Sequence, residues 1–269
     1  MKNFKNKVVV ITGAGSGIGR GLAIEFAKLN AKLAINDKNE GTLLETVNLL
    51  PEGTAVYQEA FDVSNKESMY AFAEKVNQKY GQVDVVINNA GVAIGKLMTE
   101  EVSIEEYEWI VGINLWGVMY GSLAFMPYLR KQQEASLVNI SSVFGFSGIP
   151  FQTAYCTTKF AVRGFTESLI LEEKLGNSNL TVSCVHPGGI QTNIARSALK
   201  AGKDLESVAQ FEKTFITPPD EAARTIINGI RKKKTKILIG HDAVLFDWLT
   251  KMPKFFSRKF IEYQFRKVL

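Results

Sequence analysis

The sequence predicts an α/β protein with a Rossmann-type doubly wound parallel sheet of about seven strands and helices on both of its faces. Short β-branched runs alternate along the chain with longer segments of helical period, which is the pattern of strands joined by crossover helices. A glycine-rich turn directly follows the first run. With 269 residues and 46% hydrophobic content, the chain can bury one large core.

Seven segments of the chain have the composition of strands. We expect strands at residues 7–11, 32–36, 55–61, 83–88, 136–141, 180–186 and 236–240. Because helical segments separate them, the sheet should be parallel with right-handed crossovers. In such open sheets ligands bind beyond the carboxyl ends of the strands, so functional residues should follow the strands directly.

The segments between these strands have helical periodicity. We expect helices at residues 17–29, 66–81, 104–130, 154–176 and 219–233. Gly81 and Gly176 stand where the C-terminal caps of two of these helices belong. The chain has no internal repeat and no linker rich in Pro, Gly or Ser. We therefore expect a single domain over residues 1–240, followed by a helical tail at 241–269.

The composition indicates a soluble cytoplasmic protein. Cys156 and Cys184 show no metal-ligand spacing and fit free thiols in a reducing compartment, so we expect neither a disulfide nor a metal site. The first strand-like run begins six residues from Met1, which leaves no room for a signal peptide. No apolar run is expected to approach membrane-spanning length, so we expect no transmembrane segment.

The net charge of +5 is unevenly distributed, because residues 231–236 and the last twenty residues hold much of the excess. Basic clusters of this kind are one sign of nucleic-acid binding. No recognition motif accompanies them here, and lysines commonly solvate the end of a helix. We expect no nucleic-acid partner.

The first strand runs into ITGAGSGIGR, with glycines at 13, 15, 17 and 19. This spacing does not satisfy G-x-G-x-x-G in any register. The physical arrangement is still that of a phosphate site, because a tight glycine turn opens a helix whose free N–H groups and positive dipole end can face a pyrophosphate.

An acidic residue ends the second strand. Asp37 stands 18 residues beyond Gly19, where a carboxylate can accept hydrogen bonds from ribose hydroxyls and repel a 2′-phosphate. This favours NAD over NADP as the coenzyme. Lys38 follows at once and could contact such a phosphate, so NADP stays possible.

The combination of motifs resembles the short-chain dehydrogenase/reductase family over residues 7–240. Its glycine signature matches at Thr12, Gly13, Gly17 and Gly19, and N-N-A-G follows the fourth strand at residues 88–91. The resemblance implies a nicotinamide coenzyme held by Gly13, Ser16, Gly17, Ile18, Gly19, Asp37, Asp62, Val63, Asn89, Ala90, Gly91, Tyr155, Lys159, Pro187, Gly188, Ile190 and Thr192. It also implies an NAD(P)-dependent oxidoreductase.

A tyrosine and a lysine four residues apart form the candidate proton-transfer pair. In a helix, Tyr155 and Lys159 project from one face, so the ammonium can lie near the phenol. That charge, together with an oxidised nicotinamide, should lower the pKa of Tyr155 and let it act as general base or acid.

Two further residues complete the predicted catalytic group. Ser142, 13 residues before Tyr155, would hold the substrate oxygen. By the resemblance, Asn114 helps to hold Lys159 through a water and gives it a proton route to solvent. Serines and asparagines at such places also often bond only to local backbone.

Three other features are given no catalytic role. Tyr263 and Lys267 repeat the four-residue spacing, but no glycine loop or serine accompanies them. We expect Cys156 to pack as a small apolar side chain and His186 to be structural.

The substrate should be a lipophilic alcohol or ketone. In the family, residues 194–215 would form a mobile helical flap, and its apolar members are Ile194, Ala195, Ala198, Leu199, Val208, Phe211 and Phe215. The loop before Tyr155 should add apolar wall at Phe144, Phe146, Ile149, Pro150 and Phe151. These residues could instead only pack against one another.

The tail interleaves aromatic and basic residues, with aromatics at Phe246, Trp248, Phe255, Phe256, Phe260 and Phe265. It could cover the pocket, form a contact in a homodimer or homotetramer, or touch an anionic membrane surface. We favour packing on its own or a partner subunit.

Two other functions compete with an NAD-dependent dehydrogenase. One is an NADPH-dependent 3-oxoacyl-carrier-protein reductase, against which Asp37 and the tail count. The other is a non-catalytic dinucleotide-binding regulator, which would have no chemical need for all four of the catalytic residues.

Overall fold

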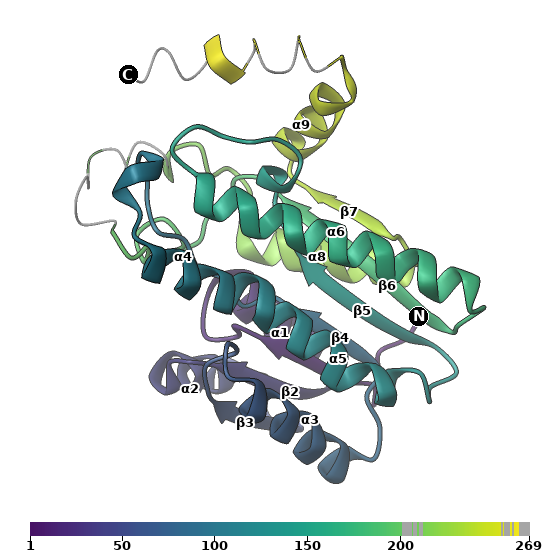
Figure 1. Cartoon of the computed structure of the whole chain (residues 1–269). Coiled ribbons are helices and arrows are strands. Elements are labelled where there is room, and N and C mark those ends of the chain that lie inside the picture. The colour runs from purple at the N-terminus through teal and green to yellow at the C-terminus, as the bar shows by residue number, and fades with distance from the viewer. Residues whose placement is uncertain are drawn as a thin grey trace.

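A computed structural model describes residues 1–200, 206, 209, 212–253, 255, 259 and 261–263 of the chain. Seven parallel strands form one sheet in the order β3-β2-β1-β4-β5-β6-β7 (Figure 1). The strands are β1 Val8–Thr12, β2 Lys32–Asp37, β3 Val56–Ala60, β4 Val85–Asn88, β5 Ala135–Ile140, β6 Leu180–Pro187 and β7 Lys236–Ile239. The predicted fold class and all seven strands are confirmed.

The strand order reverses beside β1. From β1 the chain builds outward through β2 and β3, and then returns to place β4 on the other side of β1. The loops at the carboxyl ends of β1 and β4 therefore separate and leave room between them, as at the ligand-binding crevice of other doubly wound sheets.

Helices cover both faces of the sheet (Figure 1). Among the described residues they are α1 Gly17–Lys28, α2 Glu40–Asn48, α3 Lys66–Tyr80, α4 Ile104–Val111, α5 Gly117–Leu129, α6 Thr153–Leu175, α8 Pro219–Arg231 and α9 His241–Lys251. The alternation of side chains along β1 explains the two layers. Val9 and Ile11 join the core with α1 and α8, while Val8 and Val10 face Phe72 of α3 and the helices beside it.

Helix α2 was not predicted from the sequence. Its segment carries Gly41 and few apolar residues, and only Leu43 and Thr46 are buried. The local signal is the N-cap, where the Asn39 side chain accepts a hydrogen bond from the Thr42 N–H at 3.0 Å.

The helix predicted over 104–130 contains a change of winding. Residues Gly112–Trp116 form a π-helical turn between α4 and α5, and this turn carries the buried Asn114. Such single turns widen the helix locally and alter which side chains face the sheet. Sequence periodicity cannot detect one extra residue in a turn.

The same segment corrects the expectation about apolar runs. Residues Ile104–Leu129 are long and apolar enough to cross a membrane by length and composition, although 56% of the most apolar window is buried inside the protein. A buried core helix meets the same criterion, and here α5 packs against α3 and β4.

The two predicted glycine caps differ. Gly81 ends α3 in the left-handed region at φ 72°, as expected of a glycine C-cap. Gly176 caps α6 with φ −78°, and the left-handed residue is Asn177 at φ 48°. Asparagine tolerates this conformation, so the turn moves one residue along the chain.

Candidate active site

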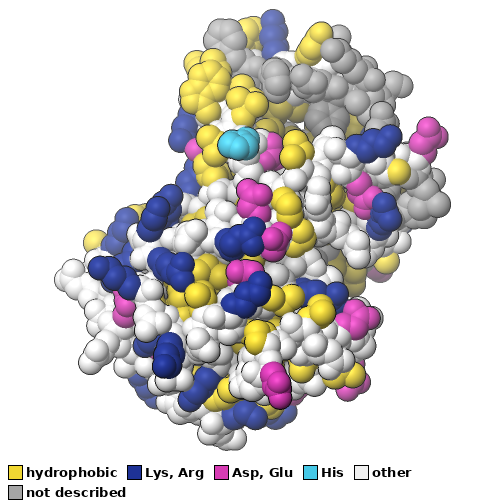
Figure 2. Space-filling model, turned by 180° about the vertical axis from the view of Figure 1, so that it is seen from behind, with side chains coloured by type: hydrophobic (Ala, Val, Ile, Leu, Met, Phe, Trp, Pro, Cys, Tyr) yellow, Lys and Arg dark blue, Asp and Glu magenta, His cyan; other side chains and the backbone are white. Residues whose placement is uncertain are grey.

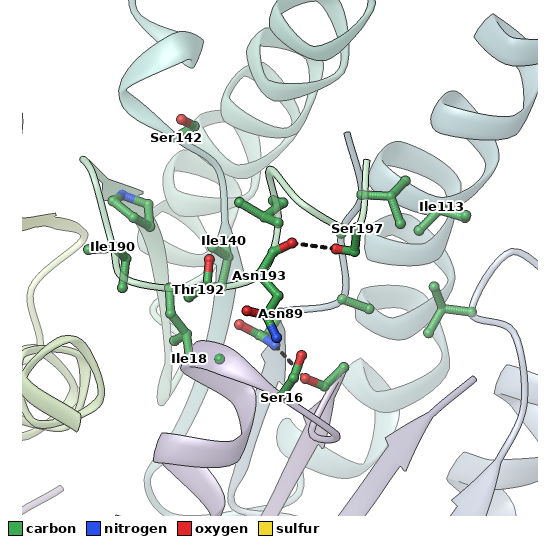
Figure 3. A pocket seen from close by; sticks show the side chains of 18 of the residues that line it. Ser16, Ile18, Asn89, Ile113, Ile140, Ser142, Ile190, Thr192, Asn193 and Ser197 are labelled. Carbon is green, nitrogen blue, oxygen red and sulfur yellow. Dashed lines mark hydrogen bonds between the residues drawn. The ribbon is translucent and has the colours of Figure 1, made fainter. Parts of the chain in front are cut away.

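A cleft of about 360 Å³ lies at the carboxyl ends of the central strands. All predicted coenzyme residues except Gly19 line it, as do the predicted catalytic residues Ser142, Tyr155 and Lys159. Figure 3 shows lining residues from distant parts of the chain gathered around the cleft, among them Ser16, Asn89, Ser142 and Thr192. Asp37 ends β2 and Ser142 follows β5, and β1 and β4 lie between these strands in the sheet, so the cleft has one end beside Asp37 and another beside Ser142 and Tyr155.

The glycine turn depends on close backbone approach. A Cβ added to Gly13, which has φ 65°, would lie 2.7 Å from the Cα of Ala90. One added to Gly19 would lie 2.0 Å from the Gly13 carbonyl oxygen. Gly19 is therefore required for packing of α1 on the turn and does not line the cleft, while its predicted part in coenzyme binding stays a prediction.

Two side chains fasten the turn to the loop after β4. The Thr12 hydroxyl accepts hydrogen bonds from the backbone N–H groups of Asn89 (3.0 Å) and Ala90 (3.1 Å). In return, the Asn89 side chain donates to the carbonyls of Thr12 (2.9 Å) and Gly13 (3.0 Å). These bonds fix the separation of the two loops that form the floor of the cleft.

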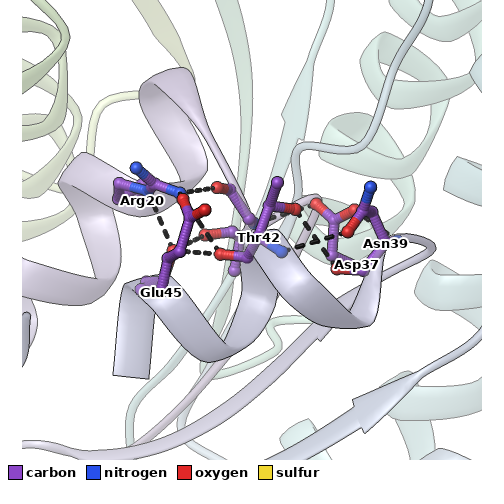
Figure 4. Close-up of polar contacts among 8 residues, drawn as sticks. Arg20, Asp37, Asn39, Thr42 and Glu45 are labelled. Atoms are coloured by element: carbon purple, nitrogen blue, oxygen red, sulfur yellow. Dashed lines mark hydrogen bonds and ion pairs between the residues drawn. The ribbon is translucent and has the colours of Figure 1, made fainter. Parts of the chain in front are cut away.

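The acidic end of the cleft is held by backbone groups. Asp37 accepts hydrogen bonds from the N–H of Gly15 (2.8 Å) and of Asn39 (3.0 Å). In Figure 4 the neighbouring Arg20 turns away from Asp37 toward Glu45 and the Thr42 carbonyl. The carboxylate of Asp37 is thus oriented at the cleft wall without a cationic side chain bonded to it in the described contacts.

The lysine after Asp37 is engaged elsewhere. Lys38 forms an ion pair with Asp62 at 2.8 Å, its side chain is 70% exposed, and both residues line the cleft. Burial by itself would raise the pKa of Asp62, but the bonds from Lys38 and Ser64 outweigh it and hold this pKa below its ordinary value.

At the other end of the cleft, three of the four predicted catalytic side chains lie together. The Lys159 ammonium lies 5.5 Å from the ring centroid of Tyr155 and donates to the Ile140 carbonyl at 3.1 Å. The Ser142 hydroxyl accepts the Phe144 N–H at 3.1 Å, and its interaction with the Tyr155 phenol acts to lower the pKa of that phenol. Strand β5 positions Ser142 while α6 positions Tyr155 and Lys159.

Burial controls the acidity of this pair. It raises the pKa of Tyr155 to about 12, although the hydrogen bond with Ser142 acts in the opposite direction. It lowers the pKa of Lys159 from 10.5 to about 8. The predicted lowering of the Tyr155 pKa depends on an oxidised nicotinamide as well as on Lys159, so it stays a prediction, and within the protein itself burial has the largest effect on this pKa.

Asn114 lies beneath the cleft rather than on its wall. Its side chain accepts the Val92 N–H (2.8 Å) and donates to the Val92 carbonyl (3.0 Å) and to the Thr158 hydroxyl (3.2 Å). A Cβ on Gly91 would lie 3.3 Å from the Lys159 ammonium and 3.4 Å from the Asn114 amide oxygen, so the two groups converge there. A proton route through Asn114 stays a prediction.

His186 contacts the backbone of the predicted catalytic residue Ser142. Its Nδ1–H donates to the Ser142 carbonyl oxygen at 3.0 Å, and its ring stacks on Phe146 at 4.1 Å. Burial lowers the pKa of His186 to about 4, so it is neutral at physiological pH. His186 therefore has a structural role, as expected, because its hydrogen bond fixes the position of the Ser142 backbone.

The predicted apolar walls are only partly correct. Of the loop residues, Phe144 packs edge-on against Tyr155 and Phe151 borders a separate cavity of about 10 Å³. Phe144, Phe146, Ile149 and Pro150 do not line the main cleft, because the loop turns their side chains into the protein or outward.

The described part of the flap contributes Ile194 and Phe215 to the cleft. Ala195 and Ala198 are buried, and Leu199 points outward with 51% exposure. Residues 194–200 form successive turns instead of a helix, and Lys200 ties them to Glu106 at 2.7 Å. Val208 and Phe211 lie outside the described residues, as do Phe256, Phe260, Phe265 and Lys267 of the tail.

Several residues that line the cleft were not predicted from the sequence. They are Asn36, Phe61, Val92, Ile113, Ile140, Ser141, Asn193 and Ser197. Asn36, Phe61, Val92, Ile140 and Ser141 flank predicted residues at strand ends, so the position rule for open sheets could have found them. Asn193 and Ser197 bond to each other in the turn after β6, where no sequence pattern indicated the cleft (Figure 3).

The fold and the cleft together define a Rossmann-type protein with a large cleft at the carboxyl ends of its central strands. Residues 7–202 match the short chain dehydrogenase family. The chain belongs to the short-chain dehydrogenase/reductase family and is an oxidoreductase of that family.

Individual relatives agree with this assignment. The protein SadH of Mycobacterium tuberculosis, named as an oxidoreductase, is 40% identical over 94% of this chain and 92% of its own length. Estradiol 17-beta-dehydrogenase 11 of Mus musculus is 31% identical over 97% of this chain and 83% of its own. A short-chain dehydrogenase/reductase from Burkholderia phymatum, solved in complex with NAD, is 32% identical with a TM-score of 0.84, over 91% and 92% of the two chains.

The residues of this chain fit a nicotinamide dinucleotide. Ser16 is the N-cap of α1 but its side chain makes no capping bond, and Ser16, Gly17 and Ile18 line the cleft at the positive end of the helix. Asp37 stands at the acidic end and Tyr155 at the catalytic end, so a molecule with a ribose at one end and a reactive ring at the other matches the order of groups.

Proposed function

We propose that the protein transfers hydride between NAD(H) and an alcohol or carbonyl group of a lipophilic substrate, with Tyr155 as general acid and base. The observation that carries this proposal is the meeting of Tyr155, Ser142 and Lys159 at one end of a cleft whose other end is formed by Asp37.

The bound nicotinamide ring would accept or supply the hydride. Tyr155 would give its phenolic proton to the substrate oxygen during reduction and take it back during oxidation. Ser142 would donate a hydrogen bond to the same oxygen and stabilise its developing charge. Lys159, nearly buried and held by the Ile140 carbonyl, would place a positive charge beside the phenol.

The protein's own groups keep Tyr155 protonated. Burial raises its pKa to about 12, so the phenol carries its proton at neutral pH but gives it up less readily than a free tyrosine, and the positive charge of Lys159 would have to stabilise the phenolate left after donation to a carbonyl. Alcohol oxidation needs the phenolate, so that direction would depend on the positive charge of the oxidised coenzyme.

The contacts of the acidic end support NAD over NADP. A 2′-phosphate would meet the Asp37 carboxylate, while the two nearest cations, Arg20 and Lys38, are already bonded to Glu45 and Asp62. The same argument disfavours the NADPH-dependent 3-oxoacyl-carrier-protein reductase.

A lipophilic substrate is supported by the walls of the cleft. Val92, Ile190, Ile194 and Phe215 supply apolar surface to it. A relative that is 31% identical is named for estradiol, a steroid alcohol. The class of substrate proposed is therefore a bulky apolar alcohol or ketone.

The first test is absorbance at the reduced-nicotinamide band, with NAD and NADP in parallel, over medium-chain, aromatic, retinoid and steroid alcohols. Turnover with NAD and a bulky apolar alcohol is expected. Coenzyme binding without any turnover would instead favour the regulator.

Two tyrosine substitutions in this chain test whether Tyr155 is the general acid and base. Tyr155→Phe should lower kcat by about 10²- to 10⁴-fold while NADH binding persists. Tyr263→Phe is the matched control, because Tyr263 lies in the tail with 58% exposure, and its turnover should be unchanged. Turnover that survives Tyr155→Phe would contradict the mechanism.

A further inference from the structure

Helix α9 exposes apolar side chains and buries an acid. Val244, Leu245 and Trp248 are 55%, 56% and 58% exposed. Asp247 is only 8% exposed and is paired with Lys236 and Lys251. A surface helix of a soluble protein has the opposite arrangement, with its apolar stripe toward the core.

The exposed apolar residues form one stripe along α9. Their spacing of three and four residues places them on one side of the helix, with His241 at its beginning and Lys251 at its end. Asp242 is the other acid of α9, and its carboxylate accepts a hydrogen bond from the Gly189 N–H at 2.6 Å. We call Val244, Leu245 and Trp248 the α9 stripe.

The chain's excess positive charge follows this helix. Residues 251–269 hold six Lys or Arg residues and one acidic residue, out of 32 and 27 in the whole chain. The first 250 residues are therefore balanced, and the whole net charge of +5 belongs to the segment after the α9 stripe. Within it, the Lys259 ammonium lies 4.3 Å from the ring centroid of Phe255, which is 60% exposed.

The α9 stripe lies on the same side of the protein as the catalytic end of the cleft. Figure 1 shows α9 beyond the carboxyl end of β7, and Figure 2 shows hydrophobic side chains gathered over this part of the surface. Asp242 of α9 bonds to the loop after β6, and α9 packs beside the turn Val143–Gly145 that follows Ser142. A surface that binds α9 would thus be close to where substrate reacts.

We propose that the α9 stripe and the basic segment after it dock the protein on an anionic lipid surface. The apolar side chains would enter the headgroup region and the basic side chains would meet the lipid phosphates, which is the chemistry of interfacial helices. A second copy fits less well, because a two-fold contact through this surface would bring two such positive segments against each other.

The test uses the full chain and sedimentation with vesicles of phosphatidylcholine alone or mixed with phosphatidylglycerol. We expect binding to the anionic vesicles, a blue shift of Trp248 emission that Trp248→Phe removes, and weaker binding at high salt. Leu245→Glu/Trp248→Glu should lower the partition coefficient at least about tenfold, because both apolar side chains are lost and two charges are added.

The matched control is Leu171→Glu/Leu175→Glu on α6, where the two leucines are 61% and 85% exposed. It adds the same charge at exposed positions and should bind vesicles nearly as well as the parent. Circular dichroism and thermal unfolding establish that both double variants are folded. Since no substrate or coenzyme is present, the result is independent of the proposed reaction.

Three outcomes would overturn the proposal. They are no binding to anionic vesicles, binding that the α9 variant retains in full, and a dimer in light scattering that the α9 variant dissociates without any vesicle binding by the parent. The last outcome would assign the stripe to a second copy of the chain.

Discussion

The two ends of the cleft are organised by different forces. At the acidic end, backbone N–H groups and short-range ion pairs orient Asp37 and Asp62. At the catalytic end, burial dominates, and it moves the pKa of Tyr155 to about 12, of Lys159 to about 8 and of His186 to about 4. Geometry is thus set by hydrogen bonds at one end, and acidity is set by desolvation at the other.

The largest effect that would test this contrast concerns Lys159. Lys159→Met keeps most of the buried volume but removes the charge beside Tyr155 and the donor to the Ile140 carbonyl. We expect kcat to fall by about 10²- to 10⁴-fold, with coenzyme binding reduced far less. Steady-state kinetics and NADH fluorescence titration measure the two.

Lys28→Met is the matched control, because Lys28 is 56% exposed, pairs with Glu25 at the C-terminal end of α1 and does not line the cleft. It should leave kcat unchanged. Equal losses in the two variants would mean that the desolvated charge at the catalytic end has no special part in turnover.

A second effect concerns how the free energy of unfolding depends on pH through His186 at the catalytic end. Unfolded His186 binds a proton near its ordinary pKa of 6.5, whereas the folded protein binds it only near pH 4. The unfolded state therefore holds more protons between these values, and stability is lost as the pH falls through this window, by about 3 kcal/mol in all. Urea unfolding from pH 7 to pH 4 measures the loss.

His186→Asn isolates this contribution, because an amide does not titrate in that range and can still donate to the Ser142 carbonyl. The variant should be less stable at pH 7, since it loses the ring that stacks on Phe146. Its stability should decline less than that of the parent toward pH 4. Parallel pH profiles for the two proteins would show that burial of His186 is not the cause.

The smallest effect belongs to the acidic end. Asp37→Asn removes the charge while its amide oxygen can still accept the Gly15 N–H. We expect the ratio of kcat/KM with NAD to that with NADP to fall about tenfold, which corresponds to about 1.4 kcal/mol, while kcat with NAD changes little. Asp220→Asn on α8, paired with Arg224 at the surface, is the control and should leave the ratio unchanged.

Much of the fold and of the site was predictable because its signals are local. The β-branched runs predict the strands, and the parallel topology follows from the helices between them. Helix α2 was not predicted, because its only local helical signal is the capping side chain of Asn39 and it has no apolar stripe. The π-helical turn at Asn114 was not predicted, because one extra residue in a turn barely changes the hydrophobic pattern of the sequence.

The apolar walls show the limit of composition. Phe144 and Phe146 have the residue type expected of a lipophilic pocket, yet one packs on Tyr155 and the other on His186. Residue type predicts that a side chain avoids water. It does not say which neighbour will cover it.

The sequence by itself determined the strand order along the chain, the glycine turn before α1, the acid at the end of β2 and the one-sided projection of Tyr155 and Lys159. Each of these follows from residues within a few turns of one another. Only the tertiary structure decided that His186 holds Ser142, that Asp242 holds the loop at Gly189, and that α9 turns its apolar stripe outward. Those pairs are separated by 44 and 53 residues, and both contact and burial at such distances depend on how whole layers pack.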